Sequence, residues 1–360
     1  MHRKNIIIVV CIVWVFLGCK TKNDVAEADF TEFTVQNTEV FLSLEDTPFL
    51  GHPTSVKAVS EGLLIVDNAY YQITKVDKEG NLLFSFGKQG RGPGEFQSIS
   101  GYWPLENEIL VYDYNSFKFS TFDQAGELKE EEVLDENPVN PNSKYSIPTT
   151  LDVISSDSLL IPTGGLQGSL FAIVDRSSVE LTYAGSPVNE FIKENEQEVM
   201  KAYTSGEISD GILNLVMLSS SSSNIYSFQQ TTGVLEKYTH EGEQVWSRGL
   251  KIPSQRTLFE KIAEINKGMK ENEYNRVYLY ARAMDVQKDG VAVLLNVPED
   301  EPLTIAWVTE DGSKIDLVKV EDITLDSAGF MEGFTISPDG QYAYFLKRSK
   351  GIIYRFEWPF

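Results

Sequence analysis

Two stretches of this sequence, residues 62–96 and 107–131, repeat one pattern of short apolar strands and turns. Each runs from an apolar strand through an aspartate, a short turn and a second strand to another aspartate and a glycine turn. The turn glycines Gly80 and Gly126 are 46 residues apart. In each unit the two aspartates are ten residues apart: Asp67 and Asp77, then Asp113 and Asp123. A repeat of about 40–50 residues made only of strands is typical of a β-propeller blade.

Four more units follow the first two, with sequences that diverge from them. They begin near residues 157, 224, 289 and 334. The sixth unit ends one strand short at Phe360, whereas residues 39–44 form a spare strand at the other end of the chain. We therefore predict an all-β fold, a six-bladed β-propeller of four-stranded antiparallel blades. Residues 39–44 should complete the last blade beside residues 352–358, which leaves the ring without an open edge.

Two insertions show helical patterns. In residues 186–203, Ser186 can cap a helix and Pro187 suits its first position. In residues 254–270, four apolar residues have the spacing of one helical stripe: Leu258, Ile262, Ile265 and Met269. We predict two short helices, which either cover the ring or form a lid over a ligand pocket. The serine run at residues 219–223 is expected to be a loop between blades three and four.

The start of the chain predicts export and lipid attachment. Basic residues precede an apolar run at residues 6–17, which is shorter than the roughly 20 residues that span a bilayer but fits a secretory signal peptide. The sequence Phe-Leu-Gly-Cys that ends at Cys19 resembles the bacterial lipobox, in which the cysteine becomes the lipid-bearing first residue. An ordinary signal peptide and an uncleaved membrane anchor are the alternatives.

These features divide the chain into three parts. We expect a lipoprotein signal peptide at residues 1–18, a flexible tether at residues 19–35 and the propeller at residues 36–360. The tether begins at the lipidated Cys19 and is polar and without periodicity up to residue 29. The expected location is the bacterial cell envelope, with the protein held by its lipid to the outer membrane.

The charge of the chain excludes one class of partner. The formal net charge is −22, and no cluster of Lys and Arg interrupts the acidity. Nucleic-acid binding requires a basic face that neutralises phosphates, so we expect no nucleic-acid partner. An anionic membrane surface would also repel this chain, which leaves the lipid as the expected membrane contact.

The first two units resemble NHL-type repeats. The matching elements are the glycine-rich loop at residues 86–96, the strand and aspartate at residues 109–113, residues 117–123 and Gly126. With the lipobox added, the whole chain is similar to six-bladed β-propeller lipoproteins of bacteria with TolB-like propellers. This resemblance implies an exported, envelope-attached propeller and implies no particular reaction.

Aspartates at strand ends are candidate calcium ligands. Asp67, Asp113 and Asp175 could ring a channel and bind Ca²⁺, although such residues more often cap turns through the neighbouring backbone. Calcium-dependent lactonases and esterases use six-bladed propellers with a central metal held by carboxylate and amide oxygens. Possible donors for such a metal are Glu61, Asn68, Asp113 and Asn224.

Aromatic residues near strand ends are candidate ligand contacts. They are Tyr70, Tyr71, Trp103, Tyr114 and Phe117. Gathered on one face they would suit sugar or peptide recognition, because flat rings stack on apolar faces, but packing between blades explains them equally well.

The glycine-rich loop at residues 90–96 allows two interpretations. It could capture an anion with its backbone N–H groups and Arg91. Alternatively, it is a crossover between blades in which the glycines permit a sharp turn and Phe96 plugs the space between two sheets.

These observations favour a non-catalytic binding or scaffold module that recognises a glycan, a peptide or an envelope protein on one face of the ring. The candidate contacts are Asp67, Tyr70, Tyr71, Arg91, Trp103, Asp113 and Tyr114. The alternative is a calcium-dependent hydrolase or lactonase with its metal in the central channel, and a purely structural role in an envelope assembly is a third possibility. Propellers serve all three functions, so the fold cannot decide among them.

Overall fold

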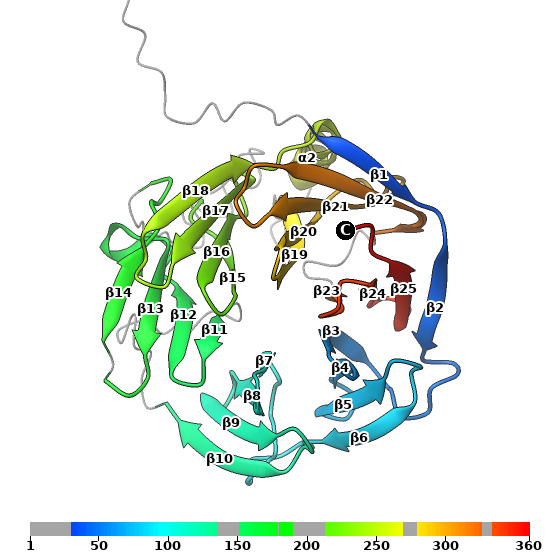
Figure 1. Ribbon diagram of the computed structural model, residues 1–360, viewed down its shortest axis with the longest axis vertical. Helices are drawn as coiled ribbons and strands as arrows, with labels where there is room; N and C mark the ends of the chain where they lie inside the picture. Colours follow the sequence, from blue (N-terminus) through cyan, green and yellow to red (C-terminus); the bar gives the residue numbers. More distant parts are fainter. Residues whose placement is uncertain (1–29, 135–150, 179, 190–212, 269–278, 326–332) are drawn as a thin grey trace, which may run out of the picture.

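The computed structural model describes residues 30–134, 151–178, 180–189, 213–268, 279–325 and 333–360. Six sheets stand around a central axis as the blades of a propeller, and the chain runs once around the ring (Figure 1). Each sheet contains four antiparallel strands, and one sheet has a fifth strand added in parallel at its outer edge. The predicted six-bladed propeller of four-stranded blades is confirmed.

Within each blade the first strand lies nearest the axis and the later strands lie further out (Figure 1). Blades one to three contain β3 (Pro53–Val59), β4 (Gly62–Asp67), β5 (Gln72–Asp77), β6 (Leu82–Phe86), β7 (Gly101–Pro104), β8 (Glu108–Asp113), β9 (Lys118–Asp123), β10 (Leu128–Val133), β11 (Asp152–Ser155), β12 (Ser158–Pro162), β13 (Phe171–Asp175) and β14 (Leu181–Ala184). Blades four to six contain β15 (Val216–Ser220), β16 (Asn224–Gln229), β17 (Val234–Thr239), β18 (Gln244–Gly249), β19 (Ala281–Gln287), β20 (Gly290–Leu295), β21 (Pro302–Thr309), β22 (Ile315–Thr324), β23 (Gly333–Ile336), β24 (Tyr342–Lys347) and β25 (Ile352–Glu357). The remaining elements are the N-terminal strands β1 (Thr31–Val35) and β2 (Thr38–Ser43), a short 3-10 turn η1 (Leu166–Gly168) and the helix α2 (Pro253–Lys267).

The two faces of the ring carry different connections. On one face lie the hairpins that join the first strand of a blade to its second and the third to its fourth, and we call this the hairpin face. On the opposite face lie the turns that join the second strand to the third, together with the segments that lead from one blade to the next. We call this the crossover face.

The hydrophobic core lies between neighbouring blades. At the junction of blades one and two, the buried Phe86 and Phe96 pack against Phe122, with ring centroids 4.6 and 6.0 Å apart. Equivalent apolar clusters fill the other junctions. Each blade is therefore stabilised by its neighbours, which explains why the strands of these blades are apolar on both faces.

The glycine between the third and fourth strands allows each blade to approach the one before it. The turn glycines of this kind are Gly80, Gly126, Gly242 and Gly312, with φ from 67° to 87°. A Cβ at Gly126 would lie 3.0 Å from the rings of Phe84 and Phe86 in blade one, and a Cβ at Gly312 would lie 2.8 Å from Trp246 in blade four. The repeated glycine thus serves both the left-handed backbone and the close contact between blades.

Strand β2 closes the ring by completing the last blade. It pairs antiparallel with β25, and Thr38 lies opposite Phe356. Glu39 forms an ion pair with Arg355 across the same two strands. The two ends of the chain therefore share one sheet, as the spare strand at residues 39–44 predicts.

Strand β1 differs from the prediction, which assigned it to the flexible tether at residues 19–35. Thr31–Val35 lie parallel to β22 at the outer edge of blade five. Glu32 pairs with Lys319 at 2.9 Å, and the ring of Phe33 packs against that of Phe360 at 5.0 Å. The prediction was wrong for these residues because a five-residue strand whose partner lies far along the chain has no local sequence signal. Residues 19–29 lie outside the described residues.

An aromatic cluster joins the C-terminus to blade five. Phe360 stacks on Trp307 with ring centroids 5.7 Å apart, and Trp358 meets both rings edge-on at 5.6 and 5.7 Å. The ammonium group of Lys314 lies over Phe33 and Phe360, at 5.6 and 6.0 Å from the ring centres. These contacts add to the strand pairing that closes the ring.

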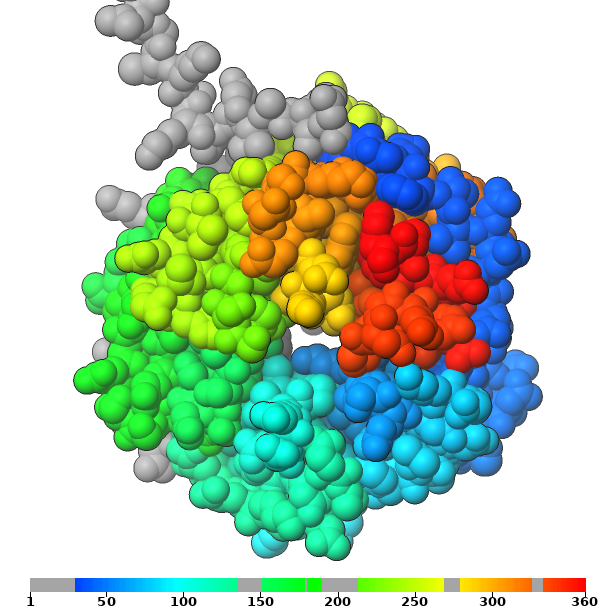
Figure 2. Space-filling view, viewed as in Figure 1, coloured from blue at the N-terminus to red at the C-terminus, as the bar shows by residue number. Residues whose placement is uncertain are grey.

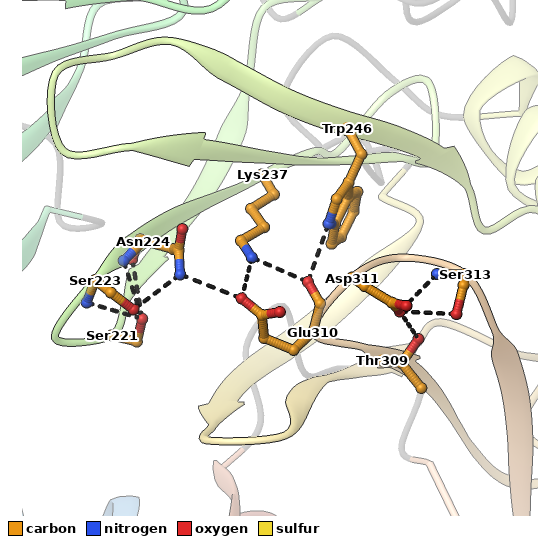
Figure 3. A network of polar contacts seen from close by, with 9 residues as sticks. All are labelled: Ser221, Ser223, Asn224, Lys237, Trp246, Thr309, Glu310, Asp311 and Ser313. Atoms are coloured by element: carbon orange, nitrogen blue, oxygen red, sulfur yellow. Dashed lines mark hydrogen bonds and ion pairs between the residues drawn. The ribbon is translucent and has the colours of Figure 1, made fainter.

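Polar contacts also connect neighbouring blades, as Figure 3 shows for blades four and five. Lys237 and Glu310 form an ion pair, and the Lys237 ammonium also donates to the Glu310 carbonyl at 3.0 Å. The indole N–H of Trp246 donates to the same carbonyl at 3.1 Å, and the amide of Asn224 reaches the Glu310 carboxylate at 3.5 Å.

The helix predicted at residues 254–270 is confirmed as α2, which buries Ile262. For the helix predicted at residues 186–203, residues 186–189 are not helical and the rest lies outside the described residues. In the described parts of the chain, no helix combines the length and hydrophobicity that a membrane span requires.

The serine run at residues 219–223 lies within blade four rather than between blades three and four. Ser219 and Ser220 belong to β15, and the following serines turn toward β16. The prediction was wrong because the first strand of this blade is short and partly polar, and its serines line the channel.

We predict that Trp358→Ala lowers the free energy of unfolding by about 3 kcal/mol, because it opens a cavity in the aromatic cluster that joins the chain ends. Urea unfolding of the purified protein measures this. Val245→Ala serves as the control, since Val245 is 52% exposed on the edge strand β18 and its truncation should change stability by less than about 0.5 kcal/mol. Equal effects of the two substitutions would contradict the closing role of the cluster.

Candidate ligand-binding channel

The first strands of all six blades line a central channel, which is open in the space-filling view (Figure 2). Toward the crossover face the channel widens to a cavity of about 380 Å³, and toward the hairpin face to a bowl of about 850 Å³. Six residues line both spaces and so form the waist of the channel: Lys57, Trp103, Asp152, Ser219, Met284 and Asp285. Both volumes lie in the range of small-molecule sites.

Lys57 projects from β3 of blade one into the waist. Its ammonium group lies over the rings of Tyr102 and Trp103, at 5.3 and 5.6 Å from the ring centres. No oxygen of the described residues accepts a hydrogen bond from this ammonium group. Lys75, Lys118 and Lys237, by contrast, each form an ion pair with a glutamate. Lys57 therefore presents three N–H donors to the channel.

Asp152 flanks Lys57 from blade three. Its carboxylate accepts a hydrogen bond of 2.6 Å from the indole N–H of Trp103 in blade two. The side chain is buried, at 9% exposure, and the contact fixes its position. The Asp152 carboxylate thus forms one wall of the waist, and its hydrogen bond with Trp103 links blades two and three.

Asp285 flanks Lys57 from blade five. Its carboxylate accepts hydrogen bonds from the Ile336 N–H at 2.9 Å, the Gln287 amide at 2.6 Å and the Thr335 hydroxyl at 3.3 Å. The same Thr335 oxygen accepts the N–H of Ala58 in blade one at 3.1 Å. A chain of hydrogen bonds therefore links blades five, six and one beside the lysine.

Burial opposes charge on all three of these groups. It lowers the pKa of Lys57, although Asp152 and Asp285 act in the opposite direction. Burial also raises the pKa of Asp152, and it raises that of Asp285 to about 6. Perturbed pKa values of this kind are common at functional sites.

The rim of the hairpin-face bowl is polar and acidic. Glu106 and Glu108 lie on the hairpin of blade two, and Ser155, Ser156 and the serines of blade four line the same bowl. This end of the channel carries more negative charge than the crossover mouth, where Arg348 and Lys57 balance the two aspartates.

Two of the predicted aspartates, Asp67 and Asp113, have a structural role. Asp67 is fully buried and accepts the backbone N–H groups of Gly51 and His52 at 2.6 and 3.0 Å. Asp113 is equally buried and accepts the N–H of Gln97 at 2.7 Å. Both carboxylates tie a crossover segment to the turn after the second strand, which matches the turn-capping alternative.

Asp175 lies elsewhere. It follows the third strand of its blade, on the hairpin face, and accepts hydrogen bonds from Ser177 and Ser178. Those hydrogen bonds, above all the one from the Ser177 hydroxyl, hold the pKa of Asp175 at about 2. The expected ring of Asp67, Asp113 and Asp175 around one opening is therefore wrong, since the residues lie on opposite faces.

The predicted aromatic contacts separate into two groups. Trp103 stands at the waist of the channel. Tyr70, Tyr71 and Tyr114 lie on the crossover face, in the turns between the second and third strands of blades one and two. Arg91 lies beside these turns, in a depression that it shares with Asn115.

The glycine-rich loop at residues 90–96 is a crossover between blades one and two. Phe96 is fully buried and exchanges hydrogen bonds with Gly90 and Lys88, at 3.0 and 2.8 Å. Gly87 lies so close to this ring that a Cβ would approach it to 2.7 Å. The loop is therefore a crossover between blades in which Phe96 fills the space between two sheets, as the structural interpretation predicts.

The proposed metal donors do not converge. Glu61 pairs with Lys75 at 2.6 Å, Asp113 is occupied by backbone N–H groups, and Asn224 bonds the carboxylate of Glu310 at 3.5 Å. Of the four, only Asn68 lines the crossover mouth. Within the described ranges, no group of three or more His, Cys, Asp or Glu side chains is placed to hold a metal ion.

Sequence reasoning missed most of the waist. Lys57, Asp152 and Asp285 lie on the first strands of their blades, which lack the repeated aspartates and turn glycines that mark the second and third strands. Lys57 and Asp285 are charged residues on the innermost strands β3 and β19, and both line the channel.

Comparisons with known proteins agree with this architecture. Residues 22–146 match a family model described as a 6-bladed beta-propeller. The protein is a six-bladed β-propeller. The comparison with curated proteins returns no match.

Solved structures with the same architecture come from several bacteria. A propeller protein of Bacteroides fragilis described as exported is 14% identical, with a TM-score of 0.53, and the alignment covers 91% of this chain and 99% of that one. A member of the DUF4221 family from Bacteroides vulgatus is 10% identical, with a TM-score of 0.52 and coverage of 90% and 96%. Virginiamycin B lyase of Staphylococcus aureus, in an inactive form with quinupristin, is 12% identical, with a TM-score of 0.50 and coverage of 89% and 99%. At these identities the likeness establishes the fold alone.

We predict that Asp285 makes stability depend on pH. Folded Asp285 has its pKa raised to about 6, whereas an unfolded aspartate titrates near 4, so the folded state binds more protons between these values. Its contribution to stability therefore falls as pH rises from about 4 to 6. Asp285→Asn removes this dependence. Urea unfolding at pH 4, 5, 6 and 7 should show a difference between wild type and variant that changes below pH 6 and levels off above it.

The matched control is Asp289→Asn, on the exposed hairpin of the same blade. Its difference from wild type should stay constant across the pH range. A constant difference for Asp285→Asn as well would show that burial does not shift the titration of this carboxyl group.

Proposed function

We propose that this propeller is an exported, lipid-anchored binding module that holds a polar ligand at the waist of its channel without transforming it. The observation that carries the proposal is the ammonium group of Lys57, which faces the channel without an acceptor among the described residues, between the held carboxylates Asp152 and Asp285. A ligand would offer an oxygen acceptor to Lys57 and N–H or O–H donors to the aspartates. Short peptides and amino sugars both carry such groups.

The surroundings favour binding from the crossover face. This mouth has the smaller cavity, and its charges nearly balance, whereas the hairpin-face bowl is wider and more acidic. The rings of Tyr102 and Trp103 form a rigid, partly apolar wall beside the lysine, and the Tyr102 hydroxyl is held by Ser55 at 3.3 Å. A preorganised wall of this kind lowers the entropy cost of binding.

The substitution Lys57→Met tests the site, because it keeps the length of the side chain and removes the charge. Thermal-shift and calorimetric titrations with tripeptides, glucosamine and N-acetylglucosamine should reveal binding to wild type and at least a tenfold loss in the variant. Lys88→Met is the control, since Lys88 is exposed on the crossover loop. If Lys57→Met bound these ligands with unchanged affinity, the channel would not be the binding site.

The lipid anchor is part of the same proposal. It rests on the apolar run at residues 6–17 and the lipobox-like sequence that ends at Cys19. The described propeller begins with β1 at Thr31, so eleven residues separate it from a lipid on Cys19. A chain of that length reaches at most about 40 Å, which would keep the propeller close to the membrane surface.

We predict that Cys19→Ala releases the protein from the membrane fraction of expressing cells, because the lipid would be the main membrane contact of a chain with net charge −22. Cell fractionation with immunoblotting, and incorporation of a labelled fatty acid, measure the change. A Cys19→Ala protein that stays in the membrane fraction would contradict the anchor.

The calcium-dependent hydrolase has less support. Its proposed donors lie on separate blades, and the carboxylates at the waist already hold neighbouring donors. A thermal shift on adding Ca²⁺ that Asp285→Asn abolishes would favour this alternative over the binding module.

A further inference from the structure

One turn position on the crossover face is occupied by an aromatic residue in blades one and two and by glycine in blades four and six. It is the residue directly before the third strand of the blade, and its φ is positive in all four blades. The residues and their φ values are Tyr71 at 54°, Phe117 at 51°, Gly233 at 67° and Gly351 at 60°. The turn therefore requires the left-handed conformation wherever it occurs.

Glycine adopts this conformation freely, whereas the Cβ of an aromatic residue is brought too close to the following carbonyl oxygen. Tyr71 and Phe117 thus occupy a position where glycine would be more stable for the backbone. Strained residues of this kind are held by the surrounding structure and cluster at binding and active sites. Because glycine occupies the same turn in blades four and six, the turn itself does not require an aromatic residue in blades one and two.

The rings at these turns are accessible. Tyr71 is half-buried, its neighbour Tyr70 is 48% exposed, and Phe117 is 36% exposed. In blade two, the rings of Tyr114 and Phe117 lie 6.0 Å apart and form one aromatic surface. Blades one and two therefore carry neighbouring aromatic platforms on the same face of the propeller.

Polar groups gather in the crossover segment that joins blades one and two, next to the turn that carries Phe117. A depression there is lined by Gln89, Gly90, Arg91, Gln97 and Asn115. The guanidinium group of Arg91 lies against the side-chain amide of Gln97, and it has no carboxylate partner among the described residues. The side-chain amides of Gln89 and Asn115 likewise have no protein partner in the described parts of the chain. In a protein with net charge −22, an exposed guanidinium without a counter-ion is a distinctive feature.

We propose that this surface of blades one and two, which we call the aromatic groove, binds an oligosaccharide that contains uronic acid. Sugar rings would stack on the platforms of Tyr71 and Phe117, and a sugar carboxylate would pair with Arg91. The amides of Gln89 and Asn115 would bond to hydroxyl groups, which both donate and accept. The site is separate from the channel waist and stands on different residues, so either proposal can fail without the other.

The first test uses hexamers of galacturonate, mannuronate and guluronate in calorimetric titrations of the full propeller. At least one should bind, and the double substitution Tyr71→Gly/Phe117→Gly should weaken that binding at least tenfold. The melting temperature of the double variant should stay equal or rise, because glycine relieves the backbone strain. A role in folding alone would lower the melting temperature, so this readout distinguishes the two explanations.

The second test addresses the acidic group. Arg91→Gln should weaken binding of the hexauronate at least fivefold while the melting temperature is unchanged. Tyr183→Ala is the control, because Tyr183 is 37% exposed on the outer strand of blade three and away from the groove. Its affinity for the hexauronate should equal that of wild type.

Several outcomes would overturn the proposal. They are the absence of binding to all three hexauronates, equal affinity for neutral maltohexaose, equal affinity for hexaglutamate, and full affinity in the double variant. A melting temperature that falls in Tyr71→Gly/Phe117→Gly would also overturn it, since the rings would then be retained for packing.

Discussion

The pairing of β2 with β25 is the contact on which the rest of the structure depends. Six sheets in a row would leave blade six open, with its outer strand missing and its apolar face in water. By supplying that strand from the beginning of the chain, the protein joins blade six to the N-terminal segment and places β23 beside β3. Strand β1 and the aromatic cluster around Phe360 reinforce the same junction from blade five.

The channel site follows from this closure. The hydrogen bond from Ala58 to Thr335 crosses the junction between blades one and six, and Thr335 in turn contacts Asp285 of blade five. Lys57 lies next to Ala58 on the same strand, so the position of its ammonium group depends on how blade six meets blade one. A site built from several blades can be rigid only if the ring is closed. The aromatic groove, by contrast, belongs to blades one and two and depends on their mutual packing alone.

The repeat was predictable from sequence because it is local. Aspartates and glycines at fixed spacing mark the second and third strands, and the turn glycines are needed wherever one blade packs on another, as Gly126 does on Phe86. The closing strand could also be predicted, since a missing strand at one end implied a spare one at the other. Strand β1 could not be predicted, because its partner β22 lies far along the chain. The channel-facing residues of the first strands could not be predicted either, because they are brought together only when the ring forms.

The residues of the candidate site divide in the same way, into residues that repeat along the chain and residues that only the ring brings together. Asp67 and Asp113 were predicted as site residues because they recur at the same place in two blades. They recur because each aspartate holds the equivalent turn of its own blade. Lys57 and Asp285 occur once each, and only the ring brings them to one place. Unique residues on the innermost strands therefore identify the channel better than repeated ones.

An engineered disulfide measures the closure most directly. The chain has two cysteines, Cys11 and Cys19, so a protein that carries Cys11→Ser and Cys19→Ser is free of other thiols. In that background, the pair Val40→Cys/Tyr354→Cys places two cysteines at directly opposite positions of β2 and β25. We predict complete oxidation to an intramolecular disulfide under mild conditions, with a higher melting temperature than in the reduced protein. Failure to form this bond in the folded monomer, or its formation only between chains, would contradict the closed ring.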